Sequence, residues 1–313
     1  MNTMNKLQKL LKEKKVLVAD GAWGTELMKR GLAAGDFPEV WNLEEPYLVK
    51  QIAEEYRNAG ADIILTNTFG ANRLKLKRTG FTGNVLEINR IGVELSKEES
   101  EGALVFASIG PTGELLKPLG DFDEADFIKV FSEQVKGLAE GKPDGIIIET
   151  MSDAREALCA FEAVRKNSSL PVGISFSFNK GHKGFATMMG LSPEQVVKTF
   201  INKKIDVIGA NCGSITIEDM IDIARTMKKF TSLPLWIKAN AGLPLLKDKK
   251  TVYPQTPEEI TSFIPGLIEA GAKIIGGCCG TTPEYIKRIR EEVDKYFDVF
   301  EEKKMEQEDI KNV

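Results

Sequence analysis

Three of the four cysteines in this 313-residue chain follow apolar runs and have glycine neighbours. Cys278 and Cys279 are adjacent within Gly276–Gly280, and Cys212 lies in Asn211-Cys212-Gly213. Two adjacent cysteines do not have the geometry that an ordinary disulfide requires. Three thiols placed in this way are instead typical ligands of one soft metal ion with a fourth position left open. The open position favours a catalytic site over a structural one.

Three thiolates favour zinc over harder cations, and they are too few for a four-cysteine structural site or an iron–sulfur cluster. A zinc ion with a vacant position can bind the thiol of a substrate. A free thiol has a pKa of ~8.5, so only a small part is ionised at neutral pH, whereas coordination to a metal deprotonates it. A negatively charged thiolate shell keeps the bound sulfur nucleophilic. This chemistry suits transfer of an alkyl group to sulfur better than hydrolysis.

Simpler interpretations of the cysteines remain open at this point. The three could be small core residues, or two of them could form a redox dithiol, although the C-x-x-C context of such sites is lacking. The fourth cysteine, Cys159, lies in a helical stretch over residues 153–166 and is expected to be a core residue. The single histidine, His182, excludes histidine-based triads and metal sites with several histidines.

The composition fits a globular protein that acts on small molecules. Apolar residues make up 42% of the chain, enough for a sizeable core, and a net charge of -4 argues against nucleic acid or an anionic membrane as the main partner. No apolar run approaches the ~20 residues that a membrane-spanning helix needs. The N-terminal sequence MNTMNKLQKLLKEKK lacks the apolar stretch of a signal peptide. With few cysteines and no export signal, we expect a cytoplasmic protein.

Eight short apolar runs, each followed by a helical pattern, must position the cysteines. They are β-rich and mostly do not alternate with polar residues, which is typical of parallel strands buried on both faces. The expected strands are Val16–Gly21, Asp62–Thr68, Leu104–Pro111, Gly145–Thr150, Pro171–Phe178, Asp206–Cys212, Leu233–Gly242 and Ala272–Gly280. Ser192-Pro193 and Thr256-Pro257 are helix start signals between them. Eight such units predict a single (β/α)8 barrel over residues 1–313, with a doubly wound open sheet as the alternative.

Both ends of the chain have patterns of their own. Leu7, Leu10 and Leu11 are spaced as on one face of a helix, so residues 1–15 are expected to form an extra helix that covers the barrel floor. Residues 296–313 are dense in charge and predict a helical or frayed tail.

Barrel enzymes carry their sites at the carboxyl ends of the strands. Cys212 would end the sixth strand and the cysteine pair the eighth, ~10 Å apart across the seventh. Metal–sulfur bonds of ~2.3 Å can close this distance, provided that the glycines break the pleat so that both adjacent cysteines face the metal. Asn240, at the end of the seventh strand, can then reach the open position. Further residues at strand ends, each with an alternative role in a turn or cap, are Asp20, Gly21, Ala22, Asn67 and Glu149.

Four motifs in this order resemble those of the zinc-dependent homocysteine S-methyltransferases. They are Asp20–Glu26, Thr66–Ala71, Asn211-Cys212 and Gly276–Pro283. The resemblance extends from about residue 16 to about residue 290. It is closest to the homocysteine-binding module of cobalamin-dependent methionine synthase, more than to the betaine or S-methylmethionine enzymes, and Asn240–Gly242 followed by Thr251–Pro254 contributes to it.

The resemblance implies a zinc ion held by Cys212, Cys278 and Cys279, with the thiolate of homocysteine as fourth ligand. It implies that Asn240 takes this fourth place in the substrate-free state and that Glu149 binds the amino group of homocysteine. Backbone amides around Gly21 and Ala22 would hold the carboxylate. Asp20 and Asn67 are expected in the substrate site as well. The implied reaction is transfer of a methyl group to homocysteine, which gives methionine.

The methyl donor is less constrained by these residues. The sequence contains no second, folate-binding barrel and no corrinoid module, so we expect a separate methylcorrinoid (cobalamin) protein to dock in trans. S-methylmethionine or a betaine-type small donor is the alternative. Two other functions compete with this one: a barrel lyase or aldolase that uses a cysteine nucleophile on a phosphorylated substrate, and a non-catalytic zinc-binding or corrinoid-docking subunit.

Overall fold

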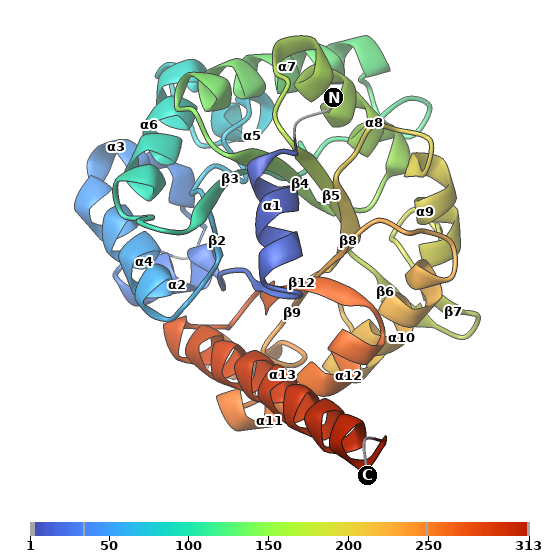
Figure 1. Ribbon diagram of the computed structural model, residues 1–313. Coiled ribbons are helices and arrows are strands. Elements are labelled where there is room, and N and C mark those ends of the chain that lie inside the picture. The colour runs from blue at the N-terminus through green and yellow to red at the C-terminus, as the bar shows by residue number, and fades with distance from the viewer. Residues whose placement is uncertain (1–3, 34, 248–249, 312–313) are drawn as a thin grey trace.

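A barrel of parallel strands forms the centre of the molecule. The computed structural model describes residues 4–33, 35–247 and 250–311, and the side chains of all of these except residue 250 and residues 300–311. Eight strands form one sheet in the order β1-β12-β9-β8-β5-β4-β3-β2. A parallel bridge between Ala19 and Ile63 joins its two ends, and helices surround it (Figure 1). The predicted (β/α)8 barrel is therefore confirmed.

Each of the eight expected runs contains one barrel strand, but most of the strands are shorter than predicted. They are β1 (Leu17–Val18), β2 (Ile63–Leu65), β3 (Leu104–Ile109), β4 (Gly145–Met151), β5 (Val172–Phe176), β8 (Val207–Asn211), β9 (Leu235–Ala239) and β12 (Ala272–Gly277). After β2, for example, Thr66–Thr68 form a tight turn in which the Thr68 amide donates to the Thr66 carbonyl at 2.8 Å. The rim also carries two hairpins that were not predicted, β6–β7 (Asn179–Gly181 and Gly184–Ala186) and β10–β11 (Leu245–Lys247 and Lys250–Val252).

The helices begin where the sequence signals them. Capping boxes form at Ser192 and Thr256, and the prolines that follow are the first residues of their helices; an N-cap of this kind contributes about 0.5–2 kcal/mol. The helices are α1 (Lys6–Glu13), α2 (Trp23–Lys29), α3 (Trp41–Glu44), α4 (Pro46–Asn58), α5 (Arg73–Arg78), α6 (Val85–Glu98), α7 (Glu124–Glu140), α8 (Ala154–Asn167), α9 (Pro193–Phe200), α10 (Ile217–Lys228), α11 (Pro257–Thr261), α12 (Ile264–Glu269) and α13 (Pro283–Lys311), with a 3-10 turn η1 (Pro38–Val40). None of those in the described ranges is both long and apolar enough to cross a membrane.

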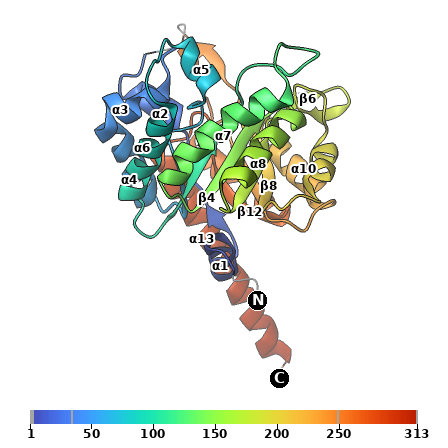
Figure 2. The same cartoon turned by 90° about the horizontal axis from the view of Figure 1, so that it is seen from above.

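Helix α1 and the later turns of α13 lie on the same side of the barrel (Figure 2). Helix α1 lies across the opening at the amino ends of the strands, and α13 extends past it (Figures 1 and 2). The tail expected over residues 296–313 is the continuation of α13 as far as Lys311, and residues 312–313 lie outside the described part.

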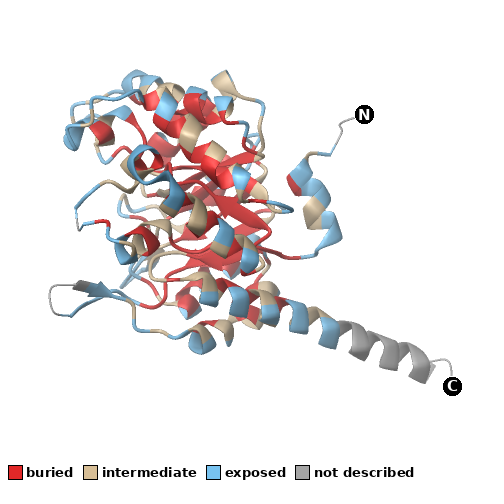
Figure 3. Ribbon diagram, turned by 90° about the vertical axis from the view of Figure 1, so that its left-hand side faces the viewer, coloured by how far each residue is buried: buried red, intermediate tan, exposed pale blue. Residues whose placement is uncertain are grey.

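Helix α1 closes the floor of the barrel with its leucines: Leu7 is buried, and the partly buried Leu10 and Leu11 pack against the same cluster. The Leu7 side chain is 1% exposed, and it packs on inward-facing residues of the strands, namely Leu17, Ala19, Ile63, Leu65, Phe106, Ile147, Val207, Trp236 and Ile274. The strands of the barrel are almost entirely buried (Figure 3). Full burial of a leucine contributes about 1.5–3 kcal/mol. The extra helix over the floor is thus confirmed, although it is shorter than residues 1–15.

Three aspartates connect α1 to the starts of alternate strands. Asp62, Asp144 and Asp206 precede β2, β4 and β8, and each accepts a hydrogen bond from a backbone amide at the start of the preceding barrel strand, at 2.8, 3.0 and 2.9 Å. The same carboxylates accept hydrogen bonds from Lys14 (2.5 Å), Lys6 (2.6 Å) and Asn5 (2.8 Å), in that order. The floor is therefore a fixed surface, and the carboxyl ends of the strands face the other way.

Candidate metal centre

The three cysteines of the rim come together in space. Cys212 directly follows β8, and Cys278 and Cys279 directly follow β12. Their sulfur atoms all lie within 4.8 Å of one another, and the sulfurs of Cys212 and Cys279 are 3.8 Å apart. In a tetrahedral site with metal–sulfur bonds of ~2.3 Å, two ligand sulfurs are ~3.8 Å apart. The residues present therefore fit a zinc ion with three protein ligands.

A break in the pleat after Gly277 lets two adjacent cysteines face the same point. The Cys278 amide still donates to Ala239 of β9 at 2.7 Å, and Thr281 closes the turn with a bond from its hydroxyl to the Cys278 carbonyl at 2.7 Å. Gly277 has no room for a side chain, because a Cβ there would lie 2.2 Å from the Thr281 hydroxyl oxygen. Of the three glycines from which the sequence analysis expected this freedom, Gly276 and Gly277 are still paired with β9, and only Gly280, with a φ angle of 82°, departs from strand geometry.

Cys212 has a backbone conformation that few residues adopt. Its φ angle is 58°, in the left-handed region, which is uncommon for residues other than glycine and is concentrated at functional sites. The preceding residue, Asn211, is hydrogen-bonded on both sides: its Oδ1 accepts from the Ser175 hydroxyl of β5 at 2.6 Å, and its Nδ2 lies 3.7 Å from the Cys278 sulfur. Asn211 therefore orients two of the three cysteines, a role that the sequence did not reveal.

The thiols are electrostatically coupled. The Cys278 thiol lowers the pKa of Cys212, but the Cys279 thiol and burial outweigh it and raise that pKa to about 11. For Cys279, the hydrogen bond with Cys212 lowers the pKa, and Cys278 together with burial raises it to about 12. Three thiolates so close together repel one another, so they require a cation to be ionised together.

Asn240 links the two cysteine loops. It follows β9, its Oδ1 accepts from the Cys279 amide at 3.1 Å, and its Nδ2 donates to the Gly213 carbonyl at 3.0 Å. The sequence placed Asn240 between the thiolates, and the structure finds it bonded to both loops. Its role as a resting-state ligand stays a prediction.

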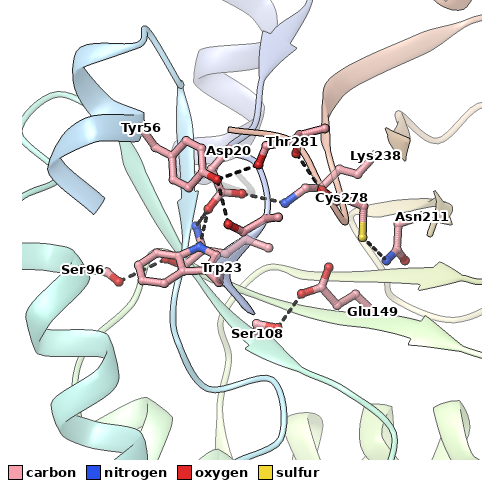
Figure 4. Close-up of polar contacts among 12 residues, drawn as sticks. Asp20, Trp23, Tyr56, Ser96, Ser108, Glu149, Asn211, Lys238, Cys278 and Thr281 are labelled. Atoms are coloured by element: carbon pink, nitrogen blue, oxygen red, sulfur yellow. Dashed lines mark hydrogen bonds and ion pairs between the residues drawn. The ribbon is translucent and has the colours of Figure 1, made fainter. Parts of the chain in front are cut away.

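Glu149 is a buried carboxylate at the end of β4. It is 7% exposed, and its Oε1 accepts from the Ser108 hydroxyl at 2.5 Å. Burial raises the pKa of Glu149, while the charge of Lys238 and the bond from Ser108 oppose this rise. Figure 4 shows Glu149 and Cys278 on the same side of the site. Binding of a cation beside the ionised Glu149 carboxylate would be strongly favoured.

Asp20 is saturated by protein groups. Its Oδ2 accepts from the Leu65 amide and the Trp23 indole, each at 2.8 Å, and its Oδ1 accepts from Lys238 at 2.6 Å (Figure 4). Lys238, in the middle of β9, is 2% exposed. Burial alone would lower its pKa, but the charges of Asp20 and Glu149 outweigh burial and raise it. The sequence analysis missed Lys238; its one signal was a lone charge inside an apolar strand.

The turn after Asp20 is packed against two hydroxyl groups. A Cβ on Gly21 would lie 2.7 Å from the Tyr56 hydroxyl and 2.9 Å from that of Thr281. The Tyr56 hydroxyl donates to the Ala22 carbonyl at 2.8 Å, and the Ala22 amide donates to Thr281 at 3.3 Å. This turn therefore holds the start of α2 beside the cysteine loop.

Two further residues complete the description of the rim. The side-chain amide of Asn67 donates through Nδ2 to the Pro38 carbonyl at 2.7 Å and to Asn42 Oδ1 at 3.0 Å. Asn67 therefore holds the segment before α4. Burial, together with the neighbouring Cys279 sulfur, raises the pKa of Tyr253. Cys159, in α8, is 3% exposed, which agrees with its expected place in the core.

The fold and the site together define a class: a (β/α)8 barrel with three cysteines at the carboxyl ends of its strands that could hold a metal ion. A family model described as homocysteine S-methyltransferase matches residues 17–293. The chain belongs to the homocysteine S-methyltransferase family, as its sequence motifs led us to expect.

Similar proteins agree with this assignment. Methionine synthase of Mycobacterium leprae is 28% identical over 294 residues, which cover 88% of this chain and 24% of that protein, and methionine synthase of Mycobacterium tuberculosis is 29% identical with the same coverage. The chain thus spans about a quarter of the length of these relatives. The metallated form of the Escherichia coli homocysteine methyltransferase MmuM is similar in fold, with a TM-score of 0.78 and 23% identity over 92% of this chain and 99% of that one.

Proposed function

We propose that this chain transfers a methyl group to the thiol of homocysteine, giving methionine, with a zinc ion held by Cys212, Cys278 and Cys279. The observation that carries the proposal is the convergence of the three sulfur atoms within 4.8 Å of one another. Membership of the family supports the substrate and the reaction. When bound, zinc would keep the substrate thiol ionised at neutral pH and correctly placed.

Glu149 is proposed to bind the ammonium group of homocysteine. Its carboxylate is buried, is fixed by Ser108, and lies in the same mouth as the cysteines. A charge-assisted hydrogen bond there contributes about 1.5–3 kcal/mol. It would orient the substrate so that its sulfur points at the metal centre.

The remaining residues are proposed to complete the substrate site. Asn240 would take the fourth position before homocysteine arrives, since its Oδ1 has a second lone pair beside the bond from Cys279. Backbone amides around Gly21 and Ala22 would hold the substrate carboxylate, and the Ala22 amide would exchange its 3.3 Å bond to the Thr281 carbonyl for the substrate. Asp20 and Asn67 would border the substrate and position these groups, each through the hydrogen bonds that it makes to the protein.

A methylcorrinoid protein that docks in trans is proposed as the donor. The resemblance to the methionine synthase module supports this choice, and so do exposed apolar side chains on the loops after the strands. Leu119, Met188 and Leu246 are 64%, 70% and 80% exposed. Leu119 and Met188 follow β3 and β7, and Leu246 lies in β10, which follows β9. Exposed apolar groups around a site are typical of a surface that binds another protein. In the reaction, the donor–methyl bond breaks as the sulfur–methyl bond forms.

We propose that residues 1–313 act as one homocysteine-binding barrel. Since the three thiols must stay reduced to hold a metal, the proposed location is a reducing compartment such as the cytoplasm.

A methyl-transfer assay tests the function. Zinc-loaded protein with homocysteine and methylcobalamin, free or bound to a corrinoid protein, is expected to form methionine and reduced corrinoid. The matched variants are Cys279→Ser, expected to be inactive, and Cys159→Ala, which removes a thiol outside the site and is expected to stay active. Turnover with S-methylmethionine or betaine, and none with a methylcorrinoid, would overturn the proposed donor but not the proposed zinc chemistry. Failure to bind homocysteine would overturn the function.

A further inference from the structure

A basic cavity lies at the end of the barrel opposite the cysteines. Its volume is about 350 Å³, and its lining includes Leu11 and Lys12 of α1, Lys228 at the end of α10, Ser232, and Lys273 at the start of β12. In Figure 1, α1 lies beside β12 and β9 at this end of the barrel. Small-molecule sites are typically cavities of ~300–1,000 Å³, so the cavity is large enough for a small ligand.

The charge of Lys273 breaks a pattern of the floor. Asp62, Asp144 and Asp206 stand one residue before β2, β4 and β8, and each forms an ion pair with a lysine or arginine. The eighth strand has Lys273 at the corresponding place, in Ala272-Lys273-Ile274 against Ala61-Asp62-Ile63. The floor is therefore neutralised at three strand starts and positively charged at the fourth.

Neighbouring lysines add to this charge. Lys12, Lys228 and Lys273 form no ion pair within the described part of the chain, although 46 acidic residues against 42 basic ones give the protein a net negative charge. The stem of Lys228 lies close to Gly271, where an added Cβ would lie 2.9 Å from its Cγ and Cδ. Like charges gathered around one cavity repel one another, and an anion relieves that repulsion.

We propose that this floor cavity binds a small polyanion whose charged groups are phosphates. Lysine ammonium groups and a serine hydroxyl are suitable donors for phosphate oxygens, and several lysines on one cavity favour a ligand with several charges. The cavity is lined from α1, α10 and β12, so a bound ligand bridges the floor helix to the barrel. Binding to the folded state alone raises the melting temperature. The site is separate from the metal centre and does not depend on the methyltransferase function.

Titration calorimetry on the zinc-loaded full chain tests the proposal, with tripolyphosphate as probe and citrate as a carboxylate comparison. The test variant is Lys228→Ala/Lys273→Ala. The matched control is Lys129→Ala/Lys136→Ala, which removes the same charge from exposed positions on α7. We expect tripolyphosphate to bind, with an affinity that falls about tenfold or more in the test variant, since a charge-assisted contact contributes about 1.5–3 kcal/mol, and that stays within about twofold in the control.

Each outcome decides the proposal. Binding of both probes with loss in the test variant supports a polyanion site, and binding of tripolyphosphate alone supports the phosphate class. Stronger binding of citrate overturns the phosphate class. Absence of binding at about 10 mM, or an equal loss in both variants, overturns the site, because the second result would reflect net charge only. Lys12→Ala, at an exposed position of α1, serves as the test variant if the double variant does not fold.

Discussion

Replacing Lys238 by methionine tests the ion pair in the barrel mouth. The Lys238 Nζ lies 2.6 Å from Asp20 Oδ1, and the two side chains are 2% and 0% exposed. Removing one partner of such a pair leaves a buried charge and costs about 3–5 kcal/mol. Asp20 would keep its bonds from the Leu65 amide and the Trp23 indole. We therefore expect Lys238→Met to cost about 3–4 kcal/mol, in the lower part of that range.

Urea unfolding of the zinc-loaded protein measures this cost. Asp20→Asn and the double variant complete a mutant cycle, and the coupling between the two positions is expected to be about 1–3 kcal/mol. Lys180→Met is the control, since Lys180 pairs with Asp219 at 2.7 Å but is 63% exposed; it should cost no more than about 1 kcal/mol. The reasoning is refuted if Lys238→Met costs no more than the control, or if the two changes are additive.

Three other changes test the site and the floor. Glu149→Gln should weaken homocysteine binding about 10- to 100-fold in calorimetry, since it removes a charge-assisted bond of about 1.5–3 kcal/mol; an unchanged affinity would exclude Glu149 from the site. Burial raises the pKa of Glu149 above its ordinary value of 4.5, so the folded protein holds the carboxyl proton more tightly than the unfolded chain does. The folded protein therefore loses stability as the pH rises from about 4.5 through the pKa of the folded state. Melting curves at several pH values should show the wild type losing stability relative to Glu149→Gln, and parallel curves would contradict this. Cys279→Ser should lose zinc, measured by metal analysis, while its circular dichroism spectrum stays native; full unfolding would argue for a structural site. Leu7→Ala should cost about 2–5 kcal/mol in urea unfolding, and a cost below about 1 kcal/mol would mean that α1 does not pack on the floor in solution.

The architecture could be predicted because its signals are local. Each βα unit has an apolar run and a helix start, and the capping boxes at Ser192 and Thr256 form as the sequence indicates. The strand ends could not be predicted, because the same residue types continue into the rim. Thr66–Thr68 are β-prone, yet they turn and bond to one another and to β3. The hairpins β6–β7 and β10–β11 lack the apolar alternation that marks a strand, since much of each is exposed.

The site could be predicted only in part, for a similar reason. Cysteines are few in this chain, so three of them at strand ends are informative without a structure. Lys238 is different, because its partner Asp20 is 218 positions away in the sequence. A lysine inside a strand normally indicates an exposed face. The pairing of both β1 and β9 with β12 brings β9 and the end of β1 close enough for the charge to be buried.

The distribution of charge across the mouth explains why the substrate would have to carry an ammonium group. Asp20 and Lys238 neutralise each other at 2.6 Å. The Ser108 hydroxyl donates a hydrogen bond to Glu149. The positive charge of Lys238 acts on Glu149 and on Asp20 at the same time. A buried carboxylate in this state favours protonation, as its raised pKa shows. An incoming ammonium group reverses that preference, whereas a thiol without one would leave Glu149 either protonated or unpaired. Selectivity among thiols would then come from Glu149, while the proposed zinc ion, held by the cysteines, would bind the thiolate of any substrate that fits.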